Sequence, residues 1–516
     1  MPSADWLVLS PVIILTFTGF LLIALTFVIK NKARLADIAL VGLGLALFLT
    51  LDMAGLGLLS RLGLELWTLP VAVEIDWLMM EVNTFTLFFF LAIILTGILV
   101  VLASRAFLTE EDRNPGEYYG LLLISLVGMI LVAAATDLFV LYLSFEMASI
   151  ATFALVAFRK RDRRATEAAM KFFIIGVISS AIILFGISLL YGVSGHVGSS
   201  QGLSGPYTDL RVLRSTITDG LLAFEPVVIL AIILMIAGFG FKVATVPFHM
   251  WVPDVYEGAP TTITTLLSTA SKIMGFVALF KIFLIALIGA ATHWALILGI
   301  LAIATMTLGN VAALPQKSVK RMLAYSSIGH AGYVLIAVVV GSHPNTAIAT
   351  LSMAGGMYHL LVYIFMQGGA FIFVALMGSL LLGEKLDDFS GLSKRMPLMA
   401  FGMMIMLLSL AGIPPLGGFV SKFILFWSAV QAAQSPGSQW MFSLAVAGVL
   451  NSALSLYYYA RVIKHMYILE GPKEPLRVPR SFGVAILLAT LGVVATGVLA
   501  LPFLDFVSRA ATAFFG

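Results

Sequence analysis

The stretch FEPVVILAIILMIAGFGFKVATVPFHMW at residues 224–251 decides the fold of this chain. After Glu225 its only Lys, Arg, Asp or Glu is Lys242, in an apolar run long enough to cross a bilayer as a helix. A cation at the centre of a bilayer costs ~2.5–3.5 kcal/mol or more, so an intramembrane lysine predicts a functional site. Lys272 and Lys422 lie in similarly apolar surroundings. Three such lysines indicate a protein that handles charge inside a membrane.

The composition indicates that the whole chain is built for a membrane. Of its 516 residues, 60% are hydrophobic and 11% are charged, whereas a soluble domain carries about 25% charged residues. We therefore predict an all-α, polytopic membrane protein with about fourteen transmembrane helices of roughly 20 residues each. The predicted spans are residues 10–29, 36–59, 84–104, 118–136, 138–158, 168–192, 226–250, 259–288, 293–313, 320–341, 347–382, 397–433, 440–468 and 481–505.

The segments outside these spans are short. The longest polar stretch, residues 193–225, is predicted to be a loop, so no large soluble domain is expected. The chain also contains no cysteine. This excludes iron–sulfur clusters and haem held by its own thiolates, disulfides and thiol catalysis.

The distribution of basic residues predicts the orientation. The loops that follow the odd-numbered spans hold 21 of the 30 Lys and Arg residues, whereas the opposite side holds 4. Cytoplasmic loops carry the excess of Lys and Arg in membrane proteins. We therefore expect these loops in the cytoplasm and both termini on the external side. The net charge of +4 follows from the same bias and does not indicate nucleic-acid binding.

Five further ionisable positions lie inside the spans. Glu146 is the only acidic residue deep in a span, about 20 Å from the cytoplasmic end. Lys171 is about 10 Å deep and within snorkelling range of the surface, and snorkelling is also expected for Lys281 at the external end of span 8. His330 and His359 lie in spans 10 and 11, either as satisfied structural histidines or as proton relays.

The charges inside the spans have two interpretations. The simpler one is that Glu146 pairs with a lysine to hold helices together. One carboxylate does not neutralise three deep lysines, however, and burial disfavours the charged form of a lysine. We therefore favour lysines that load and release protons.

Two of the predicted spans are interrupted. Pro247 in span 7 removes a backbone donor and clashes with the preceding turn, so the helix is expected to break there. A second break is expected in span 12 at AGIPPLGGFVSK, residues 411–422, which contains Pro414 and Pro415. A deep lysine lies close to each break. Interrupted spans in corresponding halves of a chain point to a transport site at a repeat interface, although the prolines could instead only shape the packing.

This pairing of breaks suggests four parts. Residues 1–104 hold helices 1–3, residues 118–288 form a first repeat of helices 4–8, residues 293–468 form a second repeat of helices 9–13, and residues 481–516 hold helix 14.

Three long motifs carry a family resemblance. They are KVATVPFHMWVPDVYEGAPTTITTLLSTASK at 242–272, NVAALPQKSVKRMLAYSSIGHAGY at 310–333 and LSLAGIPPLGGFVSKF at 408–423. They resemble the antiporter-like subunits of complex I. The form PFHMWVPDVYEGAPT and the lysine at 422 are similar to the N type, also called subunit 2 of NADH:quinone oxidoreductase, because the M type has a glutamate at that place.

The resemblance implies a fold and a set of site residues. The fold has fourteen helices with two inverted five-helix repeats, helices 4–8 and 9–13, in which helices 7 and 12 are broken. Proton-transfer roles are implied for Glu146, Lys171, Lys242, Lys272, His330 and Lys422. His249 and His359 are further possible members of the proton path.

The resemblance also implies a function. It is proton translocation by a membrane-arm subunit of a complex that passes electrons from NAD(P)H, a reduced deazaflavin or ferredoxin to a quinone. Quinone, flavin and iron–sulfur clusters are expected in partner subunits, and no cofactor or metal in this chain. The expected partners are antiporter-like M and L types, small A, J and K types, a peripheral redox arm and lipids. The expected location is the inner, energy-transducing cytoplasmic membrane.

Three alternatives remain open at this point. The chain could belong to a cation/proton antiporter of the Mrp type, in which the same lysines exchange Na⁺ or K⁺ for H⁺. It could be a subunit of a membrane-bound hydrogenase. It could also be a scaffold that only holds a membrane arm together.

Overall fold

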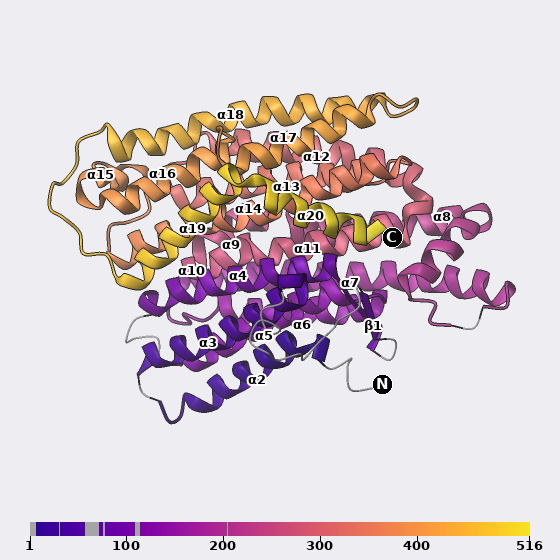
Figure 1. Ribbon diagram of the computed structural model, residues 1–516, viewed down its shortest axis with the longest axis horizontal. Helices are drawn as coiled ribbons and strands as arrows, with labels where there is room; N and C mark the ends of the chain where they lie inside the picture. Colours follow the sequence, from indigo (N-terminus) through magenta and orange to yellow (C-terminus); the bar gives the residue numbers. More distant parts are fainter. Residues whose placement is uncertain are drawn as a thin grey trace.

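The computed structural model describes residues 7–29, 31–56, 72–75, 78–108, 114–203 and 205–515. Nearly all of the regular structure in these ranges is helical, and most helices run close to parallel in one bundle (Figure 1). The first helix drawn, α2 (Ser10–Leu25), lies along one edge of the bundle, and α18 (Phe442–Tyr467) lies along the opposite edge (Figure 1). The predicted all-α class is therefore confirmed.

Each predicted span corresponds to a helix or to a broken pair of helices. The described part of the chain contains twelve helices long and apolar enough to cross a membrane. Two shorter apolar helices, α2 and α16 (Pro397–Ala411), coincide with predicted spans 1 and 12. The other spanning helices are α3 (Lys32–Leu51), α4 (Thr84–Phe107), α5 (Pro115–Ala134), α6 (Leu138–Val156), α7 (Arg163–Ser200), α8 (Leu210–Val243), α12 (Ala291–Ala313), α13 (Val319–Gly341), α14 (Thr346–Ser379) and α19 (Arg480–Val498). Helix α8 is kinked at Phe224, where φ is −127° and ψ is 25°.

The helices in the centre of the bundle are almost wholly enclosed by protein. In the segment Thr261–Ala286, in α13 and in α14, 94% of the most apolar stretch is buried, compared with 33% in α7 and in α18. Polar side chains on the three central segments therefore face other protein groups rather than lipid.

The first predicted break lies between α8 and α9 (Trp251–Gly258). Helix α8 ends where Ala244 adopts a left-handed backbone with φ 66°, and Pro247 lies in the turn that follows. The indole N–H of Trp251 donates to the carbonyl of Phe241 at 2.9 Å. Irregular backbone at membrane depth survives only where protein or water satisfies it, and this contact supplies such a partner.

The second predicted break lies between α16 and α17 (Gly417–Ala432). Helix α16 ends where Gly412 takes a φ of 87°, which glycine adopts without steric cost. Pro414 and Pro415 lie in the turn before α17, as the sequence predicts.

A third break was not predicted. Span 8 consists of α10 (Thr261–Ser268) and α11 (Ala270–Lys281), separated at Thr269 with φ −113° and ψ −86°, and it ends in the π-helical turn η4 (Ile282–Ala286). The Thr269 hydroxyl donates to the carbonyl of Thr265 at 2.6 Å. Because no Pro or Gly lies at this break, the sequence carries no signal of the kind that marks the other two.

Three further features differ from the sequence-based expectations. Residues 193–225 are mostly helical rather than a loop, because α7 and α8 continue past the predicted span ends and are joined by a hydrogen bond of 2.8 Å between Ser194 and Thr216. The antiparallel hairpin of β1 (Ala72–Ile75) and β2 (Met80–Asn83) was not predicted. Predicted helix 14 is two helices, since α19 is followed by the separate helix α20 (Ala500–Phe515).

Short elements complete the described fold. They are η1 (Asp52–Leu56), η5 (Ile288–Ala290), η6 (Leu386–Phe389), α15 (Leu392–Arg395) and η7 (Gln439–Met441).

The second break depends on a glycine. A Cβ added at Gly418 would lie 1.9 Å from the carbonyl oxygen of Ser409, and the Gly418 N–H donates to the Ser409 hydroxyl at 3.0 Å. We expect Gly418→Ala to lower the apparent melting temperature in detergent, since overpacking typically costs about 1–3 kcal/mol. The matched control is Gly483→Ala in α19, where a Cβ would meet no atom within 4 Å. A neutral Gly418→Ala would contradict the close approach.

Candidate functional site

Each of the three deep lysines lies next to a helix break. Lys242 is in the last turn of α8, Lys272 follows the break at Thr269, and Lys422 is in the first half of α17. Their side chains are 2%, 2% and 3% exposed. The prediction that Lys242 and Lys422 accompany breaks is confirmed, and the structure adds the same arrangement at Lys272.

Lys242 is held by a hydroxyl and two aromatic rings. Its Nζ donates to the Ser149 hydroxyl at 3.0 Å and lies 5.1 Å and 5.6 Å from the ring centroids of Phe145 and Phe172. Aromatic faces at this distance attract a cation, and the C-terminal end of α8 favours one as well. The aliphatic part of the Lys242 side chain lies close to Gly275 of α11. A Cβ added at Gly275 would be 3.5 Å from Lys242 Cγ.

Glu146 lies one helical turn before Ser149 on α6 and therefore on the same face. Its carboxylate accepts a hydrogen bond of 2.6 Å from Ser180 on α7. No ion pair in the described part of the chain joins Glu146 to Lys242, so the direct pair that the sequence suggested is not formed in this conformation. The Ser149 hydroxyl, rather than the carboxylate, is the group that contacts the lysine.

Lys171 reaches toward the face that carries the basic loops, as expected for a snorkelling side chain. Its Nζ lies 2.8 Å from Asp254 and 2.9 Å from Glu167, and Arg321 lies 3.0 Å from the other oxygen of Asp254. Burial raises the pKa of Asp254, but the hydrogen bonds and charges of Lys171 and Arg321 outweigh it and leave this pKa below its ordinary value. Lys171 thus belongs to an ionic cluster between α7, α9 and α13, and Glu146 is not among its partners there.

Lys320 is a buried lysine that sequence reasoning missed. It is the first residue of the predicted span 320–341 and was not among the predicted site residues. Its side chain is 4% exposed, donates to the carbonyl of Ala259 at 3.0 Å and lies 3.4 Å from Glu384. Its position at the boundary of a span gives no sign of this burial.

Lys272 connects α11 to α13. Its Nζ donates to the carbonyl of Ser327, which lies one helical turn before His330. Ser327 and His330 both belong to the buried helix α13. Lys272 of α11 therefore contacts α13 one turn away from His330.

The structure brings the two predicted histidines together. His330 Nδ1 and His359 Nε2 are 3.0 Å apart, and His359 Nδ1 is 2.9 Å from the hydroxyl of Ser421, the residue before Lys422. Ser421 donates to the carbonyl of Gly418 at 3.0 Å, so its oxygen accepts from His359. With both rings neutral, His359 Nε2 then accepts from His330, and the hydrogen bonds run in one direction along the row.

Lys422 lies at the far end of this row. Its Nζ donates to the carbonyl of Leu410 at 2.7 Å and to the Ser452 hydroxyl at 2.9 Å, and it lies 4.8 Å from the ring centroid of Tyr333. The break after α16 leaves the Leu410 carbonyl without an intrahelical partner, and the lysine supplies one.

A polar cluster beside the histidines was not predicted. Tyr459 bonds to His330 Nε2 at 3.4 Å, and Tyr458 donates at 2.8 Å to Asn310, which in turn bonds to Tyr333 at 3.3 Å. In the sequence, Asn310 and Asn451 could have indicated this cluster, because an amide inside an apolar span needs buried hydrogen-bond partners.

His249 remains apart from this row. It lies in the turn after α8, and no hydrogen bond or ion pair in the described part of the chain connects it to Lys242, Lys272 or Lys422. The described residues also contain no group of three or more His, Asp or Glu that could hold a metal ion. The polar groups that the structure assembles here are Lys272, His330, His359 and Lys422, which lie on neighbouring buried helices.

Comparisons with known proteins identify the family of this chain. The transmembrane family described as NADH:quinone oxidoreductase/Mrp antiporter matches residues 135–454. The chain is 41% identical to the F(420)H(2) dehydrogenase subunit N of Methanosarcina mazei over 98% of both chains, and 37% identical to the NADH-quinone oxidoreductase subunit N of Trichlorobacter lovleyi over 98% and 96%. A chain of respiratory complex I from Thermus thermophilus superposes with a TM-score of 0.75 at 27% identity, covering 96% and 98%.

The chain is thus a multi-pass membrane protein that belongs to the NADH:quinone oxidoreductase/Mrp antiporter transmembrane family.

Proposed function

We propose that this chain translocates protons as a membrane-arm subunit of a complex I-like oxidoreductase. The observation that carries the proposal is the row from Lys272 through His330 and His359 to Lys422, all buried in the centre of the bundle. Among the described residues, none of these four groups forms an ion pair, and helices enclose them. A row of groups that bind and release protons in such surroundings is suited to moving protons along the plane of the membrane.

Lys242 is the group whose proton affinity responds to the position of a nearby charge. A proton enters from the cytoplasm and loads Lys242, whose charged form is favoured when Glu146 approaches and disfavoured when Glu146 withdraws. In this structure Glu146 is bound to Ser180 while Lys242 is bound to Ser149, one turn away on the same helix. This is the separated arrangement of the pair, and a neighbouring subunit changes the proton affinity of Lys242 by moving Glu146.

The proton then passes along the centre of the bundle. It moves from Lys242 to Lys272, across α13 to His330, through His359 to Lys422, and leaves on the external side. We propose Lys171 as a modulator of Glu146, held by Asp254 in this conformation. The two halves, residues 118–288 and 293–468, act as repeats that each supply a broken helix and its lysine.

The complex supplies the driving reaction. We propose that flavin, iron–sulfur clusters and the quinone site lie in partner subunits, because this chain has no cysteine to hold a cluster. The partners are further antiporter-like subunits of the M and L types, small subunits of the A, J and K types, and a peripheral redox arm. We propose that the odd-numbered connections lie in the cytoplasm and both termini outside an energy-transducing cytoplasmic membrane, which the bias of basic residues supports.

Removing the first lysine tests this function. We expect Lys242→Ala to abolish redox-driven proton pumping by the complex in reconstituted vesicles, because no other group can be loaded at that position. Acidification of the vesicle lumen is measured with a fluorescent dye, and quinone reduction is measured in parallel.

The matched control is Lys473→Ala, which removes a lysine from an exposed loop and should leave pumping unchanged. Near-normal pumping by Lys242→Ala would refute the proposed mechanism. Vesicles assayed in sodium-free and sodium-containing buffer separate proton translocation from Na⁺/H⁺ exchange, which would instead require sodium.

The histidine pair provides a second test. His359→Leu removes the side chain that, in the described part of the chain, bridges His330 and Ser421. We expect pumping to fall roughly tenfold or more, since a positioned acid–base group contributes about 10²-fold or more to proton transfer. The readout is again dye acidification at matched quinone reduction.

His196→Leu serves as the control, because His196 is an exposed histidine at the end of α7. If His359→Leu pumped as well as His196→Leu, the proton would have to bypass the pair, and the row would be structural.

A further inference from the structure

A cavity of 670 Å³ lies away from the lysine and histidine row. It is bounded by the start of α4 and of α8, the end of α11, the connection between α13 and α14, and the end of α20. The segment Thr261–Ala286, which is long and apolar enough to cross a membrane, ends here. The cavity is therefore at the level of the membrane surface on the face opposite the basic loops.

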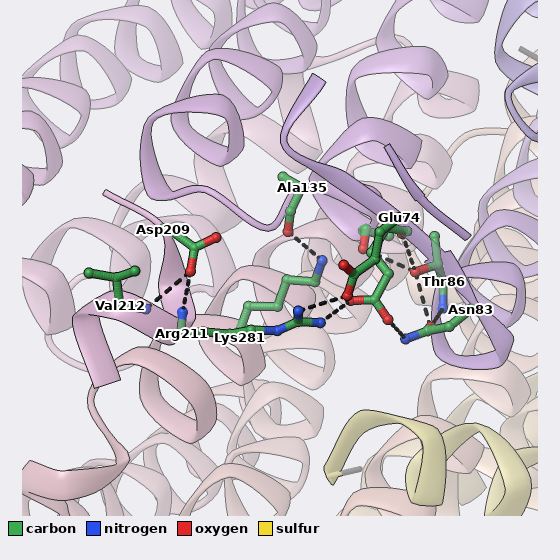
Figure 2. Close-up of polar contacts among 10 residues, drawn as sticks. Glu74, Asn83, Thr86, Ala135, Asp209, Arg211, Val212 and Lys281 are labelled. Atoms are coloured by element: carbon green, nitrogen blue, oxygen red, sulfur yellow. Dashed lines mark hydrogen bonds and ion pairs between the residues drawn. The ribbon is translucent and has the colours of Figure 1, made fainter. Parts of the chain in front are cut away.

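The buried lysine Lys281 lines this cavity. The sequence suggested that it snorkels, but its side chain is 5% exposed and its Nζ donates to the carbonyl of Ala135 at 2.6 Å (Figure 2). Ala135 is the C-cap residue of α5, and its carbonyl has no hydrogen-bond partner within that helix. Lys281 supplies a donor to this carbonyl. No ion pair in the described part of the chain includes Lys281, and only one of its three N–H donors is engaged there.

The carboxylate that lines the same cavity is already occupied. One oxygen of Glu81 accepts from Arg211 at 2.8 Å, and the other accepts from Asn83 at 2.7 Å. Arg211 also binds Glu74 at 2.7 Å, which fixes the β1–β2 hairpin to the start of α8 (Figure 2). Both oxygens of Glu81 thus already have partners, and no ion pair among the described residues joins Glu81 to Lys281.

Two further donors line the cavity. Arg214 is exposed and belongs to no ion pair among the described residues. His343 is 6% exposed, and its Nδ1 accepts from the Asn345 N–H at 3.1 Å, so in the neutral ring the proton is on Nε2. That Nε2 is buried and has no hydrogen-bond partner among the described residues. Among the charged side chains that line the cavity, Arg211, Arg214 and Lys281 are cationic, whereas Glu81 is the one anionic group described there.

The remaining wall is apolar. Leu284, Ile285, Ile288 and Phe515 line it beside the charged side. A free inorganic anion would make no contact with this apolar wall. A molecule with an anionic headgroup and a hydrocarbon tail would contact both the cationic side chains and the apolar wall. A surplus of cationic donors next to aliphatic side chains at the membrane surface is the arrangement that recognises the headgroup of an anionic lipid.

We propose that this cavity binds the phosphate of an anionic phospholipid. The phosphate oxygens accept hydrogen bonds from Lys281 and Arg214, and the start of the acyl or isoprenoid chain packs against Leu284, Ile285 and Ile288. The bound lipid holds α4, α8, α11 and α20 together at this face. This site is independent of the proton path, because none of its residues belongs to the row of lysines and histidines.

A photoactivatable phosphatidylglycerol tests the site in the purified complex. We expect cross-links to map to the peptide that contains Leu284–Ile288, and unlabelled phosphatidylglycerol, but neither phosphatidylcholine nor inorganic phosphate, to compete. Lys281→Met should lower cross-linking by roughly tenfold, the effect of losing one charge-assisted hydrogen bond. Arg214→Gln should lower it as well.

The matched control is Arg509→Gln, an exposed arginine of α20 that pairs with Asp505 and does not line the cavity. It should cross-link like the unmodified complex. Unchanged cross-linking in Lys281→Met, equal competition by phosphatidylcholine, or competition by inorganic phosphate alone would each overturn the proposal. If Lys281→Met does not assemble, Arg214→Gln decides the question, since that side chain is exposed.

Discussion

The rest of the structure depends on keeping ammonium groups inside a bundle that contains few counter-charges. A buried charge is tolerated only when it is hydrogen-bonded. The structure meets this requirement mainly with backbone carbonyls and hydroxyls: Ser149 for Lys242, the Ser327 carbonyl for Lys272, and the Leu410 carbonyl for Lys422. Partners without a full charge hold the lysine less firmly than a carboxylate, which suits a group that must release its proton.

The broken helices explain how such partners become available. A continuous helix uses its own carbonyls, whereas the ends on either side of a break leave several of them open. At α16 the open Leu410 carbonyl accepts directly from Lys422. At α8 the break places Lys242 in a last turn, where the helix dipole favours a cation. The break at Thr269 lies three residues before Lys272 and serves this lysine in a less direct way, because it ends α10 at Ser268.

The central histidines fill the interval between the lysines. His330 and His359 come from neighbouring helices, α13 and α14, and their facing nitrogens are 3.0 Å apart. Tyr459 and Ser421 occupy the outer nitrogens, so each neutral ring has a partner on both sides. A proton added at one end is passed on only if these hydrogen bonds reverse, which couples the position of one proton to the orientation of the whole row. The lipid cavity at the membrane surface is separate and contributes cohesion between helices.

The sequence by itself determined the membrane class, the fourteen spans, the breaks at Pro247 and at Pro414–Pro415, and the deep lysines. These follow from hydrophobic length and from backbone chemistry, which act locally along the chain. Only the tertiary structure decided which groups meet. The contact between His330 and His359, the separation of Glu146 from Lys242, the burial of Lys281 and Lys320, and the break at Thr269 all depend on neighbours distant in sequence. Local patterns do not encode them, because a side chain's partner is set by how helices pack rather than by the residues on either side of it.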